Sequence, residues 1–264
     1  DCLKNGVEIC ELCFYDKKHV LLNKCMKNNF IASTIAYAEA LIWNKEKLQQ
    51  YTDCFICPSQ FIHDKMLQGG FNSSKLNTLC NFIDVEKTKK ETYEKGDYYC
   101  YIGRLSHEKG IETLIKAASQ LPYTLKIIGG GSLAKMLKDK TTGTNIELLG
   151  FKNWLEIKEL IGKARFTVIP SECYENNPLS VIEAKCLGTP ILGSNIGGIP
   201  ELIEEGVSGL LFEPKSVEDL KHKIEAMFQL KVDYQQLASV SQQTYSSENY
   251  YNHLMDFYQG TNLN

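Results

Sequence analysis

The sequence predicts an α/β fold built on a parallel β-sheet. Between residues 97 and 230, short apolar segments alternate with segments of helical periodicity. Strands and helices that alternate at this spacing are typical of a parallel sheet with helices on both faces. Polar or glycine-rich loops, such as Gly129–Ser132, follow the apolar segments. In open sheets of this kind, loops at the carboxyl ends of the strands bind ligands.

The individual elements follow from this alternation. Apolar runs of four or five residues predict strands at 98–102, 124–128, 145–149, 166–169, 190–193 and 209–212. Helical patterns lie between them, at 111–121, after Ser132, and at 154–162, 178–187, 199–204 and 217–228. Together they predict one complete Rossmann-like domain, which we assign to residues 97–240.

Residues 1–85 contain too few elements for a second complete domain. They read as a polar cysteine-containing stretch and then, in order, a helix, a strand, a helix and a strand, at 30–50, 54–57, 59–68 and 77–83. One and a half α/β units predict the partial end of a first Rossmann-like domain.

Two further segments complete the predicted organisation. Residues 86–96 are rich in charge, have no apolar face and read as a linker. Residues 241–264 include a predicted helix with aromatic residues at helical spacing between 248 and 258. Because so aromatic a helix has to be covered, we expect it to pack back on the first domain.

Composition disfavours several classes of function. The chain has 264 residues, of which 43% are hydrophobic, and a net charge of −3. A slightly acidic chain has no overall electrostatic attraction to nucleic acid. No apolar run approaches the length of a membrane span. A dehydrogenase is not indicated, because no unit combines Gly-x-Gly-x-x-Gly with an acidic residue about 20 positions later.

Ten cysteines is a high count for a cytosolic protein, but the two Rossmann-like halves indicate a reducing compartment, so we expect free thiols and a cytoplasmic location. Cys100 and Cys186 lie in apolar surroundings and are predicted core residues. One set of soft ligands lies near the N-terminus and consists of Cys10, Cys13, His19 and Cys25. This set is compatible with a structural zinc site, although its spacing matches no standard zinc motif. The alternative is a group of reduced cysteines packed under a loop.

The loop after the first strand of the complete domain carries two cations. Arg104 and Lys109 lie between glycines at 103 and 110. An arginine fork and a lysine ammonium at the carboxyl end of a strand can hold a diphosphate. The alternative is an ordinary solvated loop.

The loop after the strand at 166–169 carries the second group of candidate residues. Glu175 lies in this loop, Pro178 suits the first turn of the following helix, and Glu183 lies inside that helix. A helix start attracts phosphate, and a carboxylate can accept ribose hydroxyl groups. This combination predicts a site for a nucleotide-sugar. The alternative is that both glutamates are ordinary surface charges.

Taken together, these segments resemble the retaining glycosyltransferases of family 4, which have the GT-B fold. The resemblance covers residues 98 to about 228 and rests on the matching pieces at 103–105, 108–110, 127–131, 150–151, 175 with 183, 188–190, 197–201, 206 and 209. The segment Tyr174–Ser180 resembles members that build bacterial capsule or lipopolysaccharide glycans.

The resemblance implies a role for each candidate residue. Arg104 and Lys109 would hold the donor diphosphate, and with Glu175, which faces the donor sugar, they form the expected catalytic group. The remaining expected donor contacts are Phe151 at the base, Asn177, the backbone N–H groups of Leu179 and Ser180, and Glu183 at the ribose.

Two features depart from the family pattern. Asn176-Asn177-Pro178 stands where Gly-Phe-Gly is common, and Pro178 lacks an N–H that could bind phosphate. The beginning of the first domain, which holds most acceptor contacts in the family, is also missing.

The expected activity is transfer of a sugar, with retention, from a UDP- or GDP-sugar to a glycan or lipid-linked acceptor. No cofactor or catalytic metal is expected, and peripheral contact with the inner face of the membrane suits a lipid-linked acceptor. The alternative is a truncated, non-catalytic nucleotide-sugar-binding module. A sugar-nucleotide epimerase is less well supported, because no adequate acid–base set accompanies the expected sugar site.

Overall fold

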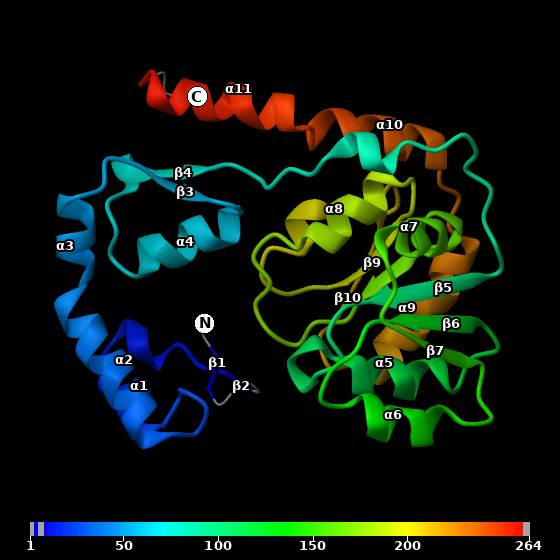
Figure 1. Ribbon diagram of the computed structural model, residues 1–264, viewed down its shortest axis with the longest axis horizontal. Helices are drawn as coiled ribbons and strands as arrows, with labels where there is room; N and C mark the ends of the chain where they lie inside the picture. Colours follow the sequence, from blue (N-terminus) through cyan, green and yellow to red (C-terminus); the bar gives the residue numbers. More distant parts are fainter. Residues whose placement is uncertain (1–2, 5–7, 261–264) are drawn as a thin grey trace. The chain divides into compact units, whose positions relative to one another are not determined.

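The computed structural model describes residues 3–4 and 8–260 (Figure 1). Its internal contacts divide the chain into two compact units, Asp1–Leu79 and Cys80–Asn264. Within the described residues, no helix has both the length and the apolar character needed to cross a membrane.

The second unit is built on a six-stranded sheet in which every pair of neighbouring strands is parallel. Its strands are β5 (Tyr98–Ile102), β6 (Thr124–Ile128), β7 (Ile146–Gly150), β8 (Thr167–Ile169), β9 (Ile191–Ser194) and β10 (Gly209–Phe212). Their order in the sheet is β10-β9-β8-β5-β6-β7, so the chain first builds outward from β5 on one side and then on the other. This is the Rossmann order, and it confirms the predicted parallel α/β architecture.

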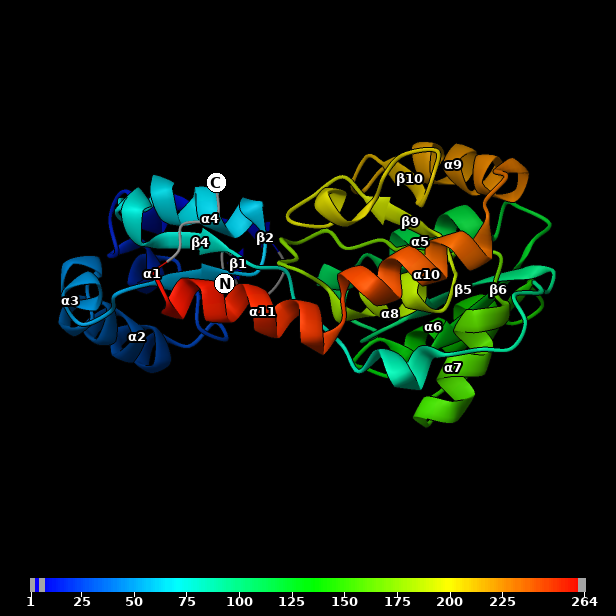
Figure 2. The ribbon, with the colours of Figure 1, turned by 90° about the horizontal axis from the view of Figure 1, so that it is seen from above.

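Helices cover both faces of this sheet (Figures 1 and 2). They are α5 (Ile111–Ala118), α6 (Ala134–Thr141), α7 (Trp154–Lys163), α8 (Leu179–Cys186) and α9 (Val217–Gln229), and they are followed by α10 (Tyr234–Thr244), which packs on α8, and α11 (Ser247–Tyr258). The predicted helix at 199–204 is only a 3-10 turn, η5 (Pro200–Leu202). Ile203 is already extended, and the next residues form a bridge from Glu205 to Gly209.

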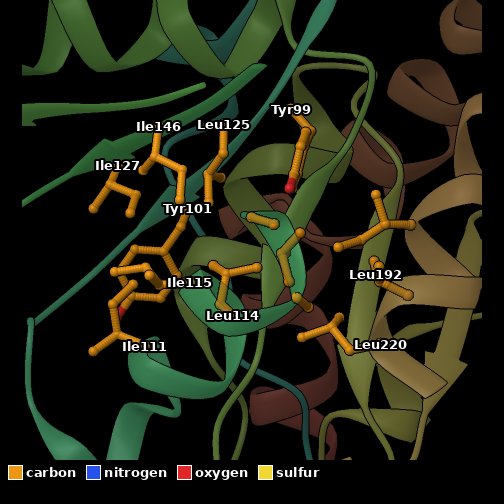
Figure 3. Close-up of a cluster of buried hydrophobic side chains, with 14 of the residues drawn as sticks. Tyr99, Tyr101, Ile111, Leu114, Ile115, Leu125, Ile127, Ile146, Leu192 and Leu220 are labelled. Atoms are coloured by element: carbon orange, nitrogen blue, oxygen red, sulfur yellow. The ribbon is translucent and has the colours of Figure 1, made fainter. Parts of the chain in front are cut away.

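The alternation of side chains along β5 separates two hydrophobic cores. Tyr99 and Tyr101 enter a core that also contains residues of α5, α6 and α9 (Figure 3). Cys100 and Ile102 point to the opposite face, which is packed by α7 and α8. Cys100 and Cys186 are both fully buried, as predicted for small core residues.

The segment predicted as a linker is attached to the second unit. It includes η3 (Val85–Thr88), whose Thr88 is buried. Lys90 Nζ and Lys95 Nζ both donate hydrogen bonds to the carbonyl of Gly162 near the end of α7, at 2.7 and 3.0 Å. Cations at a helix carboxyl end satisfy exposed carbonyls and are favoured by the helix dipole. The contact-based division therefore falls after Leu79, before the predicted domain boundary at residue 85.

The first unit contains short strands and four helices among its described residues. Its elements are β1 (Leu3–Lys4), β2 (Glu8–Ile9), η1 (Leu12–Phe14), α1 (His19–Leu22), α2 (Phe30–Ile42), α3 (Lys45–Gln50), β3 (Phe55–Cys57), α4 (Gln60–Gln68), η2 (Ser73–Lys75) and β4 (Leu76–Thr78). Strands β3 and β4 form a parallel pair.

Two predicted elements of the first unit have different limits in the structure. The single helix predicted at 30–50 is two helices, because Trp43 leaves helical geometry and the Asn44 side chain caps α3 by accepting from Lys47 N. The strand predicted at 77–83 ends at Thr78. Beyond it, Asn81 is hydrogen-bonded to Asn177 instead of a neighbouring strand.

The buried hydroxyl group of Tyr99 yields a prediction about stability. Tyr99 packs against Phe166 and Phe228, and among the described residues its hydroxyl has no hydrogen-bond partner. Removing an unsatisfied buried polar group relieves its desolvation cost. We expect Tyr99→Phe to leave the free energy of unfolding in urea unchanged or to raise it by about 1 kcal/mol.

Tyr101→Phe is the matched control. The Tyr101 hydroxyl donates to the carbonyl of Arg104 at 2.7 Å, so its removal should lower the free energy of unfolding by about 1 kcal/mol. Equal destabilisation by both substitutions would contradict the assignment.

Lys95 yields a prediction about pH dependence. Burial lowers the pKa of Lys95 to about 7, against 10.5 for an ordinary lysine. Between these values the unfolded chain holds a proton that the folded chain has lost, so this residue makes the free energy of unfolding rise with pH above about 7. The slope has an upper limit of about 1.4 kcal/mol per pH unit.

Urea unfolding at several pH values between 7 and 8.5 tests this expectation. The difference in unfolding free energy between the native chain and Lys95→Met should grow with pH in favour of the native chain. A difference that is constant across this interval would show that Lys95 keeps its proton in the folded state.

Candidate functional site

The candidate site lies at the carboxyl edge of the six-stranded sheet, between β5 and β8. These two strands are neighbours, with Cys100 paired with Thr167, although they are separated by two intervening strands in the chain. From β5 the chain adds strands on one side of the sheet, and from β8 it adds them on the other. Ligands of open α/β sheets bind at such a switch point. The loops that leave the two strands, 103–110 and 170–178, carry half of the eight donor-site residues predicted from the sequence: Arg104, Lys109, Glu175 and Asn177.

The two loops are held together by backbone contacts. The N–H of Glu172 donates to the carbonyl of Glu108 at 2.9 Å. Gly110 has a φ of 65°, and a Cβ atom at this position would lie 1.8 Å from the carbonyl oxygen of Pro170. Both the backbone angle and the close approach therefore require glycine. The packing of this glycine fixes the distance between the two loops.

Lys109 and Glu175 meet between these loops. The Lys109 ammonium forms an ion pair with Glu175 Oε1, and the two side chains are 30% and 16% exposed. The Ser171 hydroxyl donates to the same carboxylate oxygen at 2.7 Å. An ammonium has three donors and a carboxylate has several acceptor positions, so both groups keep the capacity to bind a ligand.

Arg104 lies in the same loop as Lys109 and has an exposed guanidinium group and a hydrogen-bonded backbone carbonyl. Its side chain is 73% exposed, and its Nη1 lies 4.0 Å from Glu108 Oε1. Its carbonyl accepts the hydrogen bond from Tyr101 described above. A guanidinium that is this exposed and only loosely paired is available to a phosphate group.

A pocket of about 330 Å³ adjoins Arg104 and is lined by residues from the ends of β5, β6 and β7. Phe151 forms part of its wall and is 84% exposed. A Cβ atom on Gly130 would lie 2.4 Å from the Phe151 ring, so glycine lets the ring approach the backbone closely. An exposed aromatic ring beside a pocket of this size can stack on a planar ring of a ligand.

Helix α8 offers a backbone anion site and an unpaired carboxylate. Pro178 is its N-cap residue and no side chain caps the helix start, where the N–H groups of Leu179 and Ser180 lie. Glu183 is half-buried, and burial raises the pKa of its carboxyl group. Among the described residues, no side chain or backbone group forms a hydrogen bond or ion pair with this carboxylate.

Asn177 is placed differently from the other predicted donor contacts. Its side chain is only 6% exposed and is hydrogen-bonded to Cys80 and Asn81. Because the Asn177 amide already has partners within the protein, it differs from the exposed side chains that can bind a ligand.

The sequence-based interpretation missed two supports of Glu175. One is Ser171, whose own carbonyl accepts a hydrogen bond from Ser194 Oγ at 2.8 Å. The other is the pair Gly197–Gly198: the N–H of Gly198 donates to the Glu175 carbonyl at 2.7 Å, and a Cβ on Gly197 would lie 2.4 Å from that oxygen. The only sequence signal was a hydroxyl and a glycine pair, each shortly after an apolar segment.

The proposed zinc ligands lie in the first unit. Within residues 3–4 and 8–260, no group of three or more Cys, His, Asp or Glu side chains is arranged to hold a metal ion. Cys10, Cys13 and Cys25 are free thiols. Burial, followed by the influence of neighbouring thiols, raises the pKa of Cys13 and Cys25, which favours their protonated forms. The structural zinc site at Cys10, Cys13, His19 and Cys25 stays a prediction from the sequence.

The sheet order and its covering helices define a Rossmann-type α/β domain. A family model described as "Glycosyl transferases group 1" matches residues 82–245, which is more than half of the chain. The chain therefore belongs to the group 1 glycosyltransferase family.

Proteins of similar sequence agree with this assignment. The chain is 30% identical to the uncharacterized glycosyltransferase MJ1178 of Methanocaldococcus jannaschii over 66% of its own length and 49% of the relative's. It is 27% identical to the amylovoran biosynthesis glycosyltransferase AmsK of Erwinia amylovora, over 69% and 54% of the two chains. The chain thus spans about half the length of the curated relatives it matches.

Solved structures show the same fold. The lipopolysaccharide outer core galactosyltransferase WaaB superposes with a TM-score of 0.71 at 17% identity, over 81% of this chain and 63% of that one. HepE of Anabaena, in complex with UDP, gives a TM-score of 0.73 at 19% identity, over 92% and 77%. These similarities confirm the predicted GT-B fold class.

The packing at Gly110 yields a prediction about stability, for which a substitution at Gly143 is the control. Gly143 also has a positive φ, of 76°, but a Cβ there would meet no atom within 4 Å. Gly143→Ala should therefore cost only the backbone penalty, about 1–2 kcal/mol in the free energy of unfolding. Gly110→Ala adds a clash with Pro170 and should cost about 1–3 kcal/mol more. Equal losses in urea unfolding would show that the two loops do not need this close approach.

Proposed function

We propose that the chain contains the donor-binding domain of a retaining glycosyltransferase of family 4, which transfers a hexosyl group from a nucleotide-diphosphate-sugar. The observation that supports this most directly is the position of the Lys109–Glu175 pair. It lies at the switch point of the sheet, between loops that also carry Arg104 and the start of α8. Cations, an anion-binding helix start and a hydroxyl-accepting carboxylate match the parts of such a donor.

In this proposal the donor diphosphate is bound by Arg104, Lys109 and the backbone N–H groups of Leu179 and Ser180. The exposed Arg104 guanidinium binds phosphate oxygens through two parallel hydrogen bonds. The ammonium of Lys109 contributes a charge that its pairing with Glu175 holds in place. The start of α8 adds N–H donors and the positive end of a helix dipole.

The nucleoside binds at one end of this diphosphate, through its base and its ribose. Its base stacks on Phe151 in the pocket beside Arg104. Its ribose hydroxyl groups donate to Glu183, whose half-buried carboxylate is otherwise unpaired among the described residues. Burial without a partner is costly for a carboxylate, and hydroxyl donors from the ligand offset that cost.

Glu175 orients the donor sugar by accepting hydrogen bonds from its hydroxyl groups. Because this carboxylate is ion-paired and hydrogen-bonded, it is a poor covalent nucleophile. As the bond from the sugar to the diphosphate breaks, negative charge grows on the leaving phosphate and is stabilised by the two cations and the helix start. The acceptor hydroxyl attacks from the same face and transfers its proton to that phosphate, so the configuration is retained. This route requires no catalytic metal.

The proposed donor is a UDP- or GDP-sugar. HepE structures that share the fold contain UDP and UDP-glucose, which makes the UDP-sugars the first donors to test. The proposed acceptor is a bacterial capsule or lipopolysaccharide glycan, or its lipid-linked precursor. Relatives named for amylovoran biosynthesis, for a Klebsiella pneumoniae cps region and for lipopolysaccharide outer core support this choice.

The proposed organisation assigns acceptor contacts to the partial first domain, residues 1–85, and donor contacts to residues 97–240. Residues 86–96 join the two in the chain. The proposed location is the cytoplasm, at the inner face of the membrane where lipid-linked acceptors lie.

A second candidate is a module that binds the donor without transferring its sugar. The observation that favours it is that the chain spans about half the length of the curated relatives it matches. Calorimetric titration with UDP-sugars, followed by assays of transfer and donor hydrolysis, separates the two candidates. Binding without turnover supports the module, and turnover supports the enzyme.

Arg104→Ala tests the proposed chemistry. Loss of a group that stabilises the leaving diphosphate should lower turnover of the donor by roughly 100-fold or more. Lys116→Ala is the control, because Lys116 is exposed on α5 outside both loops and should leave turnover unchanged. Near-normal turnover of the Arg104 variant would refute its role.

A further inference from the structure

Asn177 links the donor loop to the first residues of the second unit. Its Oδ1 accepts hydrogen bonds from the backbone N–H of Asn81 at 3.1 Å and from the thiol of Cys80 at 3.3 Å. Its Nδ2 lies 3.1 Å from Cys80 Sγ, and its carbonyl accepts from Asn81 Nδ2 at 3.0 Å. Each asparagine thus bonds to the other's backbone, and both the oxygen and the nitrogen of the Asn177 amide have partners.

Cys80 and Asn81, which bind Asn177, belong to residues 80–83, called the 80–83 segment below. This segment has its own contacts with other parts of the second unit. The N–H of Ile83 donates to the carbonyl of Tyr245 at 3.1 Å. The Phe82 ring packs against Tyr250, with centroids 4.4 Å apart. Asn177 is therefore bonded to a segment that has fixed contacts with the carboxyl-terminal helices.

Asn177 occupies a central place in the donor loop. It lies two residues after Glu175 and directly before Pro178, the N-cap of α8. The other end of this stretch is held by Gly198, whose N–H donates to the Glu175 carbonyl. With the Glu175 end fixed by Gly198 and the helix end fixed through Asn177, the short stretch has two attachment points.

We propose that Asn177 is a positioning residue for the nucleotide-sugar donor, which holds Glu175 and the start of α8 in register by bonding to the 80–83 segment. The donor part of this inference rests on the proposed function. An amide suits the task because it donates and accepts at once, so it can satisfy a backbone N–H and a thiol sulfur together. Preorganised binding groups lose less conformational entropy when the ligand arrives.

Amide hydrogen exchange of the native chain and three variants tests, without any ligand, whether Asn177 holds the loop in place. Asn177→Ala should speed amide exchange across residues 174–180 by roughly 5- to 10-fold, the factor expected for one lost hydrogen bond. Asn81→Ala alters no residue of the loop, yet it removes the bond to the Asn177 carbonyl and should speed exchange in the same residues. Ile224→Val, a core change in α9, is the control for general destabilisation and should leave the exchange of 174–180 unchanged.

UDP titration of the same four proteins, and of the double variant Asn81→Ala/Asn177→Ala, tests the donor part. We expect UDP affinity to fall by about 10-fold in Asn177→Ala and less in Asn81→Ala, with the double variant no worse than Asn177→Ala alone. Ile224→Val should bind UDP normally even if its melting temperature is lower.

The outcomes separate the inference from the proposed function. Unchanged exchange of residues 174–180 in both asparagine variants overturns the positioning role. Faster exchange with native UDP affinity overturns its link to the donor. A native chain that binds no UDP contradicts the donor part together with the proposed function, whereas the exchange data still decide whether the 80–83 segment holds the loop.

Discussion

The contact between the loops after β5 and β8 is the constraint on which the site depends. Gly110 approaches the Pro170 carbonyl so closely that no side chain fits between them. This approach places Lys109 against Glu175, although the two residues are 66 positions apart in the chain. Since β5 and β8 are direct neighbours at the switch point, the sheet order and the site have the same origin.

The sequence predicted the second unit well because its strands are short, apolar and separated by clear helical patterns. All six predicted strands are present within one or two residues of their predicted positions. The first unit was less predictable, because Asn44 can cap a new helix only after the chain has left the previous one at Trp43. Helix α10 went unpredicted, and it is stabilised partly by packing on α8, a tertiary contact that periodicity does not reveal.

The site could be predicted as a set of residue types but not as a set of contacts. The sequence placed Lys109 and Glu175 in loops that follow two predicted strands, but their ion pair depends on β5 and β8 being neighbours in the sheet. The hydrogen bonds of the Asn177 side chain were not predicted either, because they involve Cys80 and Asn81, almost 100 residues earlier in the chain. The zinc site at the cysteines near the N-terminus stays a prediction, although the described residues contain no group of side chains arranged to hold a metal ion.

The strand order also sorts the site into two halves. Loops that follow β6 and β7 bring Gly130 and Phe151 to one side, while loops that follow β8 and β9 bring Glu175 and Gly197 to the other. The loop after β5 joins the two halves, because its Arg104 lines the pocket beside Phe151 and its Lys109 pairs with Glu175. Under the function proposed above, one short loop would therefore couple the recognition of the base to that of the sugar, and a shift in its backbone would disturb both.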